Sequence, residues 1–455
     1  MRFVCSGKPN ESSRLPAVTD NWHRGCLPLV MLLISATPPA AGDNAWVLVS
    51  SALVLMMCIP GLFLFYGGLV RSKNVLSVAA QCLALTALGL LLWWAVGYSL
   101  VFGKNFGGSA LGHVFGGSEH FRFAGIGVEA SAYDGRIYAG TFAVFQAMFA
   151  AITPALIVGA VAERMKFSAV MLFSALWTVF VYYPVAHAVW GATGDFAGLA
   201  NAASAFKAAD FAGGIVVHMT SGWSALVLCI VVGPRIGFGK RAMPPHSMVL
   251  CVLGTGLLWA GWYGFNAGSA LAADGVALQA FLTTTLGAAT ATLTWAAVER
   301  MHRGKVSVLG LCSGAIAGLA TVTNAAGFVS GGSAVLIGVL AGALSYWACS
   351  VLKPMLGYDD ALDTFGVHGV GGTIGALATA LLMDGSINEA GGKLASSGLI
   401  SGQLTAMIAT ILLSLAVTWL LAKFVAATVG LRPTEEAESQ GLDIADHGEE
   451  GYNNS

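Results

Sequence analysis

Apolar segments of about twenty residues alternate with short polar joints from Ala45 almost to the end of the chain. A helix needs about 20 apolar residues to cross the hydrocarbon core of a bilayer, so each segment predicts a membrane-spanning helix. The eleven expected spans fall at 45–70, 76–102, 139–162, 168–190, 211–232, 246–267, 277–300, 306–326, 332–352, 363–384 and 397–424. We therefore expect an all-α membrane protein with eleven transmembrane helices.

The basic residues of the joints predict how these helices are oriented. They lie in every second joint, and joints rich in Lys and Arg are typically cytoplasmic. The residues are Arg71, Lys73, Arg164, Lys166, Arg235, Lys240, Arg241, Arg300, Arg303, Lys305 and Lys353. We expect a multi-pass protein of the plasma (inner) membrane, with its mature N-terminus outside and its C-terminus in the cytoplasm.

The composition agrees with a membrane protein. Hydrophobic residues make up 56% of the chain and charged residues 10%, which would leave a soluble domain with almost no polar surface. The 59 glycines are typical of closely packed membrane helices. A net charge of −1 gives no indication of nucleic-acid binding, and the 8 cysteines contain no CxxC pair, so we expect them to be core residues.

The residues before the first span resemble a targeting sequence. Arg24 precedes an apolar run, Leu27 to Ile34, and the small residues at 39–42 could be a cleavage site. The expected organisation is a signal peptide at 1–42, a transmembrane domain at 43–424 and a cytoplasmic tail at 425–455.

Two histidines within the apolar spans are the strongest candidates for a functional site. His218 lies eight residues after Asp210, and His368 lies five residues after Asp363, and both segments contain glycines. Ionisable side chains at membrane depth are costly and usually face a cavity or a pathway. Asp210 and Asp363 are expected either to cap the starts of their helices or to act on a substrate directly.

Two sequence similarities within the chain predict an internal repeat. Residues 65–68 (Phe-Tyr-Gly-Gly) resemble residues 262–265 (Trp-Tyr-Gly-Phe), and the Asp-to-His segments recur in the fifth and tenth spans. A unit of five helices reverses its orientation in the second copy, so we expect two inverted five-helix repeats plus an extra C-terminal helix. The two imidazoles should then meet near the membrane midplane, in a central pore.

Several longer motifs carry a resemblance to a known family. They are 65–71 (FYGGLVR), 157–164 (IVGAVAER), 210–218 (DFAGGIVVH), 264–269 (GFNAGS), 312–319 (CSGAIAGL) and 365–369 (FGVHG). From Asp43 to the tail the chain resembles the ammonium transporter (Amt/Mep/Rh) family, and above all its bacterial Amt-type members. This resemblance implies a homotrimer in which every subunit has its own pore, with no cofactor and no enzymatic activity.

The resemblance also assigns roles to individual residues. Trp190 and Ser269 would recruit ammonium at the outer mouth, Phe149 and Phe265 would stack as a gate, and His218 with His368 would line the pore. By sequence alone Trp190 is more typical of the membrane interface, and the two phenylalanines of a core. The joint between Trp190 and Asp210 is longer than in the family pattern, which puts the shape of the outer vestibule in question.

The chemistry of these residues predicts how ammonium is distinguished from potassium. A Trp face attracts either cation, and a Ser hydroxyl can accept a hydrogen bond from ammonium. Moving a bare charge through an apolar bore costs on the order of 20 kcal/mol in the idealised limit. Ammonium can lose its proton and potassium cannot, so we expect ammonia to pass along the imidazoles while the proton crosses separately. If the proton is instead released outside, the protein is an ammonia channel.

The acidic tail from Thr434 to Ser455 is either a solvated end or a regulatory element. Its resemblance to the family's cytoplasmic terminus implies communication between subunits and a PII-type signal protein as a partner at the cytoplasmic pore mouths.

Other classes of function stay open at this point. One is an ammonium sensor with little flux, and another is a Rh-type gas channel. A third is a metalloenzyme, which the spacings disfavour because eight and five residues do not place two ligands on one helical face. His187 and His246 are as well explained by packing between helices as by function.

Overall fold

The computed structural model describes residues 39–133, 135–395 and 398–452, which form helices joined by loops, with two isolated β-bridges. The part of the predicted signal peptide before Pro39 lies outside the described residues. Ten helical segments of the described chain are long and apolar enough to cross a membrane. They are Ala41–Leu69, Ser72–Phe102, Ala139–Val161, Phe167–Trp190, Gly214–Val232, Met248–Gly268, Gly275–Arg303, Gly331–Leu356, Phe365–Leu382 and Leu399–Thr428.

The expected eighth span, 306–326, contains a shorter apolar helix. This helix, α11, covers Val308–Val322 and has 15 residues. It is followed by a turn that includes Asn324, rather than by a further helical turn. Ten of the eleven predicted spans are therefore long apolar helices, and the eighth predicted span contains a short one.

Several spans consist of two consecutive helices. The helices within the spans are α1 (Ala41–Met56), α2 (Phe63–Leu69), α3 (Val75–Leu92), α4 (Tyr98–Phe102), α5 (Ala139–Val161), α6 (Phe167–Trp177), α7 (Tyr183–Trp190), α8 (Thr220–Val232), α9 (Met248–Gly268), α10 (Gly275–Arg303), α12 (Gly331–Trp347), α13 (Lys353–Leu356), α14 (Gly371–Leu382) and α16 (Leu399–Thr428). Two spans begin with a widened helical turn, at Gly214–Met219 before α8 and at Phe365–Val370 before α14.

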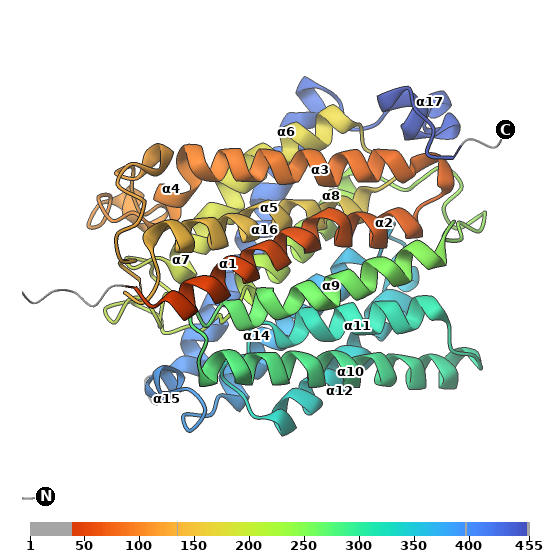
Figure 1. Cartoon of the computed structure of the whole chain (residues 1–455). Coiled ribbons are helices and arrows are strands. Elements are labelled where there is room, and N and C mark those ends of the chain that lie inside the picture. The colour runs from red at the N-terminus through yellow and green to blue at the C-terminus, as the bar shows by residue number, and fades with distance from the viewer. Residues whose placement is uncertain (1–38, 134, 396–397, 453–455) are drawn as a thin grey trace, which may run out of the picture. The chain divides into compact units, whose positions relative to one another are not determined.

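The helices of the described chain lie lengthwise beside one another, with loops at two opposite ends (Figure 1). The start of α1, the ends of α4 and α7, and the short helix α15 (Glu389–Ala395) lie at one end. We call this the Trp190 end. Helix α17 (Glu435–Gln440) and the C-terminal segment lie at the other, which we call the tail end.

The acidic tail is docked on the helices. Asp443 accepts a hydrogen bond from Ser77 N (2.7 Å) in the first turn of α3, and Asp446 accepts one from Phe167 N (3.1 Å) at the start of α6. Both helices lack a cap from their own N-cap side chain, so the tail carboxylates serve that purpose. Burial raises the pKa of both Asp443 and Asp446.

Candidate functional site

Asp210 caps the widened turn that leads into α8. It is buried, and its two carboxylate oxygens accept hydrogen bonds from four consecutive backbone amides. These are Gly213 N (2.7 Å), Gly214 N (2.8 Å), Ile215 N (2.8 Å) and Val216 N (2.9 Å). A helix start leaves four N–H groups without a partner, and this one carboxylate binds all four.

The turn that leads into α14 is capped by Asp360, and not by Asp363 as expected. Asp360 accepts from Thr364 N (3.1 Å) and Phe365 N (2.7 Å), whereas Asp363 forms an ion pair with Lys353. The physical reason is the backbone of Asp363, which has φ +62 and turns its side chain away from the helix start.

The two caps occupy matching positions in their segments. Gly213, three residues after Asp210, has φ +112, just as Asp363 follows Asp360 by three residues with a positive φ. Asp210 precedes His218 by eight residues, and Asp360 precedes His368 by eight. This equal spacing was visible in the sequence and would have identified the correct cap.

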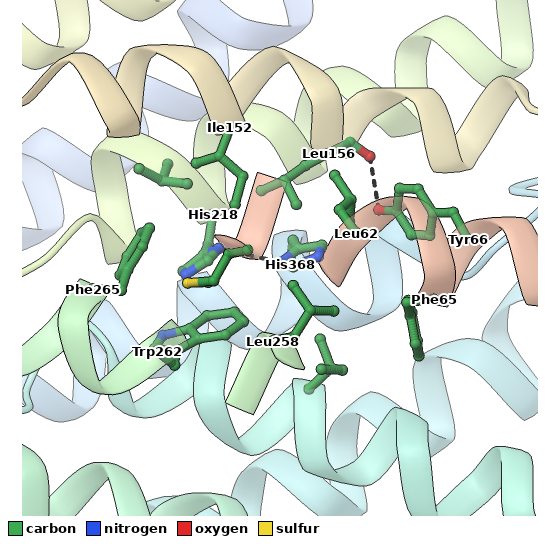
Figure 2. Close-up of a pocket in the computed structure, with 13 residues that line it drawn as sticks. Leu62, Phe65, Tyr66, Ile152, Leu156, His218, Leu258, Trp262, Phe265 and His368 are labelled. Carbon is green, nitrogen blue, oxygen red and sulfur yellow. Dashed lines mark hydrogen bonds between the residues drawn. The ribbon is translucent and has the colours of Figure 1, made fainter. Parts of the chain in front are cut away.

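The two imidazoles lie in contact in the protein interior. His218 Nδ1 and His368 Nδ1 are 3.2 Å apart, and the rings are 5.1 Å apart at an angle of 18°. Both side chains are buried, and Figure 2 shows them at the centre of a group of mostly apolar side chains. The prediction that the two histidines come together is therefore met in this structure.

Glycines bring the two histidine segments together. A Cβ on Gly222 would lie 2.0 Å from Gly369 N, and a Cβ on Gly372 would lie 2.9 Å from His218 Cβ. Gly222 follows His218 by four residues and Gly372 follows His368 by four, so a larger residue at either glycine would separate the imidazoles. Trp223 Nε1 donates to Thr373 Oγ1 (3.1 Å), and these residues follow the histidines by five.

A narrow cavity surrounds the histidine pair. Its volume is about 20 Å³, which is room for about one water-sized molecule. Its lining residues are Met57, Leu62, Phe65, Tyr66, Ile152, Leu156, Val217, His218, Leu258, Trp262, Phe265, Ile316 and His368.

The polar groups of this cavity are nearly all engaged. The Tyr66 hydroxyl donates to Leu156 O (3.0 Å), and Trp262 Nε1 donates to Thr323 Oγ1 (2.8 Å). His218 Nε2 is buried and has no hydrogen-bond partner within the described part of the chain. Within the same described contacts His368 bonds only through Nδ1, so the Nε2 atoms of both imidazoles are free to bind a small molecule with N–H or lone-pair groups.

Two phenylalanines separate this cavity from a second one at the Trp190 end. The rings of Phe149 and Phe265 are 4.4 Å apart at an angle of 37°, and both are buried. Phe265 lines the histidine cavity, whereas Phe149 lines the second cavity, of about 140 Å³. Phe149 also meets Trp190 edge to face at 5.9 Å.

Trp190 and Ser269 both line the second cavity. Trp190 Nε1 donates to Asp210 O (3.0 Å), which fixes the indole beside the capped turn. The Ser269 hydroxyl donates to Phe265 O (2.8 Å), so its oxygen keeps lone pairs with which to accept. The cavity thus combines an aromatic ring with a hydrogen-bond acceptor.

Other residues of this cavity were not identified from the sequence. They are Phe102, Tyr133, Phe142, Gln146, Leu199, Phe211 and Leu271. Tyr133 stacks on Phe142 (5.0 Å, 8°), and its hydroxyl accepts from Ala192 N (3.0 Å). Tyr133 and Leu199 lie in loops, where no periodic pattern marks the residues that face a cavity.

The longer joint between Trp190 and Asp210 is a folded loop. Ala197 and Ala208 form a β-bridge, and Lys207 Nζ donates to Ala202 O and Ser204 Oγ (3.2 Å) inside it. Leu199, on this loop, reaches the second cavity. This joint therefore contributes to the wall of the second cavity, and none of its residues lines the histidine cavity.

The described residues contain no group of three or more His, Cys, Asp or Glu side chains that could hold a metal ion.

Asp359, next to the second cap, forms an ion pair with Arg235 (2.8 Å). Burial opposes the ionisation of Asp359, but the hydrogen bond and charge of Arg235 outweigh it and lower its pKa.

Comparison with known proteins gives a consistent result. The profile of the Ammonium Transporter Family matches residues 45–452. An ammonium transporter of Bacillus subtilis is 44% identical over 417 residues, which cover 91% of this chain and 99% of the relative. Solved structures of similar fold include Mep2 of Saccharomyces cerevisiae (36% identity, TM-score 0.81, 92% of this chain and 93% of that chain) and a Sensor Amt Protein (29% identity, TM-score 0.79, 89% and 98%).

Proposed function

The chain belongs to the ammonium transporter family, and we propose that it recruits ammonium at Trp190 and Ser269 and conducts ammonia past His218 and His368. The observation that carries this proposal is the contact of the two imidazoles in an apolar cavity with room for about one water-sized molecule.

Recruitment depends on the second cavity. The Trp190 face attracts a monovalent cation, and the Ser269 oxygen accepts one of its N–H groups. Asp210 is among the residues that line the same cavity, and its carboxylate caps the turn beside it. These groups favour potassium as well as ammonium, so they concentrate cations without selecting among them.

Selection follows at the Phe149 and Phe265 pair. The stacked rings and the apolar cavity beyond them offer a bare cation no ligands, at a cost on the order of 20 kcal/mol in the idealised limit. Ammonium loses its proton near the gate and continues as neutral ammonia. Potassium has no proton to lose and is rejected.

The histidine pair can transfer the released proton by a separate route. Two Nδ1 atoms at 3.2 Å form one hydrogen bond only if one donates and the other accepts. One imidazole then carries its proton on Nδ1 and its partner on Nε2, and a proton that enters one ring can leave from the other. Transport with the proton carries one positive charge per ammonium.

We also propose the finer architecture of the pore. Helix α11 serves as an eleventh span, and two inverted five-helix repeats are followed by α16. The matching caps support this, as do two exchanged contacts: Phe211 N donates to Asn324 O (3.2 Å), and Ala361 N donates to Ala160 O (3.3 Å). Each of these donors directly follows its cap, and each acceptor follows or ends a helix of the other repeat.

In the membrane we infer that the Trp190 end faces outward and the tail end faces the cytoplasm. The basic residues of the joints support this orientation in a plasma (inner) membrane. The protein would form a homotrimer with one pore per subunit. A PII-type signal protein is the proposed partner at the tail end, where the docked acidic tail is within its reach.

A sensor with little flux is the second candidate, because one of the similar structures is a Sensor Amt Protein. Ammonium flux into proteoliposomes separates the two functions. A transporter gives a saturable ammonium-driven current, whereas a sensor binds ammonium without one. A Rh-type gas channel would carry ammonia without any current.

The central test is the current on a solid-supported membrane after a pulse of ammonium or potassium. The wild type should respond to ammonium alone, and His218→Asp should admit potassium because a fixed carboxylate offers the cation a ligand. His302→Gln is the matched control, since His302 bonds Tyr346 Oη (2.7 Å) and does not line the histidine cavity. Unchanged selectivity in His218→Asp would place the discrimination outside the histidine cavity.

A further inference from the structure

A third buried histidine has an unusual pair of partners. His187 lies in the last turn of α7, three residues before Trp190, and is fully buried. Its Nδ1 is 2.8 Å from Val101 O, and its Nε2 is 3.1 Å from Gly112 O. Both partners are carbonyl oxygens, which accept hydrogen bonds and cannot donate them.

A neutral imidazole can satisfy only one of these oxygens. It has one N–H, so its second nitrogen would direct a lone pair at the other carbonyl in a site closed to solvent. A ring with two N–H groups donates to both oxygens and carries a positive charge. The geometry therefore fits the imidazolium form.

Two helix ends stabilise such a charge. His187 lies in the last turn of α7, and Val101 lies in the last turn of α4. These turns end the spans Phe167–Trp190 and Ser72–Phe102. The C-terminal end of a helix carries unpaired carbonyls and a partial negative charge, which favour a cation.

We propose that His187 is held as an imidazolium and is a positioning residue for Trp190, an inference that rests on the proposed function. Its two bonds tie the end of α7 to α4 and to the loop that carries Gly112, while Gly191 N donates to His187 O (2.8 Å). Loss of the proton releases one of these ties. The indole of Trp190 then keeps its hydrogen bond to Asp210 O, but the end of α7 that carries it is held less firmly.

The titratable groups of the loop that carries Gly112 have partners of their own, and on α7 the buried Tyr183 hydroxyl has no hydrogen-bond partner among the described residues. On the loop that carries Gly112, His113 pairs with Asp195 (2.9 Å) and Glu119 accepts from Asn105 N (3.3 Å). Lys104 lies beside Glu119, which also accepts from its backbone N, and Tyr133 accepts from Ala192 N. Across the described contacts, none of these side chains bonds the His187 ring, so the two carbonyls determine its proton count.

Solid-state ¹⁵N NMR of the wild-type protein in lipid bilayers tests the proton count directly, at about pH 7.5, where a free imidazole is mostly neutral. The His187 signals are assigned through its neighbours Ala186 and Ala188. His246 is the matched control, because its Nδ1 also meets a carbonyl, Val70 O (2.8 Å), but its Nε2 meets Tyr452 Oη (2.9 Å), which can donate. We expect two N–H groups on His187 and one on His246. A single N–H on His187 overturns the proposal, whatever the protein transports.

Transport kinetics test the positioning role. His187→Gln should raise the KM for the ammonium ion about five- to tenfold at mildly acidic pH, with the maximal rate near that of the wild type, because it weakens one charge-assisted hydrogen bond. The KM is expressed as the concentration of ammonium ion alone. On this basis the wild-type KM should rise towards that of the variant as the pH increases, and the KM of the variant should show no such rise. His246→Gln should follow the wild type.

Identical pH profiles for the wild type and His187→Gln would overturn the positioning role. If His187→Gln does not fold, the wild-type profile decides: a KM for the ammonium ion that does not rise with pH overturns the role. Absence of ammonium flux in the wild type would contradict the proposed function instead, and the proton count would still be measured.

Discussion

The two helical segments that carry His218 and His368 begin with the same kind of aspartate cap, but the charges around the two caps differ. Asp210 accepts from four backbone amides and, among the described residues, takes part in no ion pair. Asp360 accepts from two amides, and its backbone carbonyl accepts from Lys353 Nζ (3.1 Å). Its neighbour Asp359 is paired with Arg235.

This difference separates two uses of one structural unit. At the tail end, fixed cations neutralise the carboxylates around the cap, so the unit serves mainly to hold His368. At the Trp190 end, the carboxylate is balanced only by the partial charges of a helix start. Asp210 is also among the residues that line the second cavity, so its carboxylate would make the electrostatic potential there more negative.

Removal of the two cap carboxylates should have the largest effect and should be unequal. We expect Asp210→Ala to lower the free energy of unfolding by about 3 kcal/mol and Asp360→Ala by about 1 to 2 kcal/mol, because fewer amides lose a charged acceptor. Thermal unfolding in detergent measures the shifts, and the ammonium current should disappear only in Asp210→Ala. Equal losses in both assays would remove the proposed distinction.

Neutralisation of the tail-end cation Lys353 should have a smaller effect. Lys353→Met leaves the partly buried Asp363 without its partner and should cost about 1 to 2 kcal/mol of stability. The double variant Lys353→Met with Asp363→Asn should recover most of that loss, because no unpaired charge remains. Thermal unfolding of Lys353→Met, Asp363→Asn and the double variant completes this double-mutant cycle. Additive losses would show that the pair does not stabilise the second half-helix.

The hydrogen bond between the two half-helices should have the smallest effect. Trp223→Phe and Thr373→Val each remove the bond between Trp223 Nε1 and Thr373 Oγ1, at about 0.6 kcal/mol as measured for such bonds in membranes. The two changes should not be additive, because they remove the same bond. A loss several times larger in one variant alone would mean that its side chain has a further role.

Much of this molecule could be predicted from residue order. The length and apolarity of ten spans follow from the thickness of a bilayer, and His218 and His368 stand out because ionisable groups are costly at membrane depth. A helix cap, one of the two roles expected for Asp363, was wrong, because Asp360 accepts from the backbone amides and Asp363 pairs with Lys353. The equal spacing from Asp210 to His218 and from Asp360 to His368 would have corrected it.

The chain by itself determined the apolar spans, the two buried imidazoles and the glycines that follow them, because these depend on local composition and on spacing along one helix. Only the tertiary structure decided that Nδ1 meets Nδ1, that Phe265 stacks on Phe149, and that His187 faces two carbonyls. These contacts join segments far apart in the chain. Their geometry depends on how whole helices pack, and no local pattern of residues specifies it.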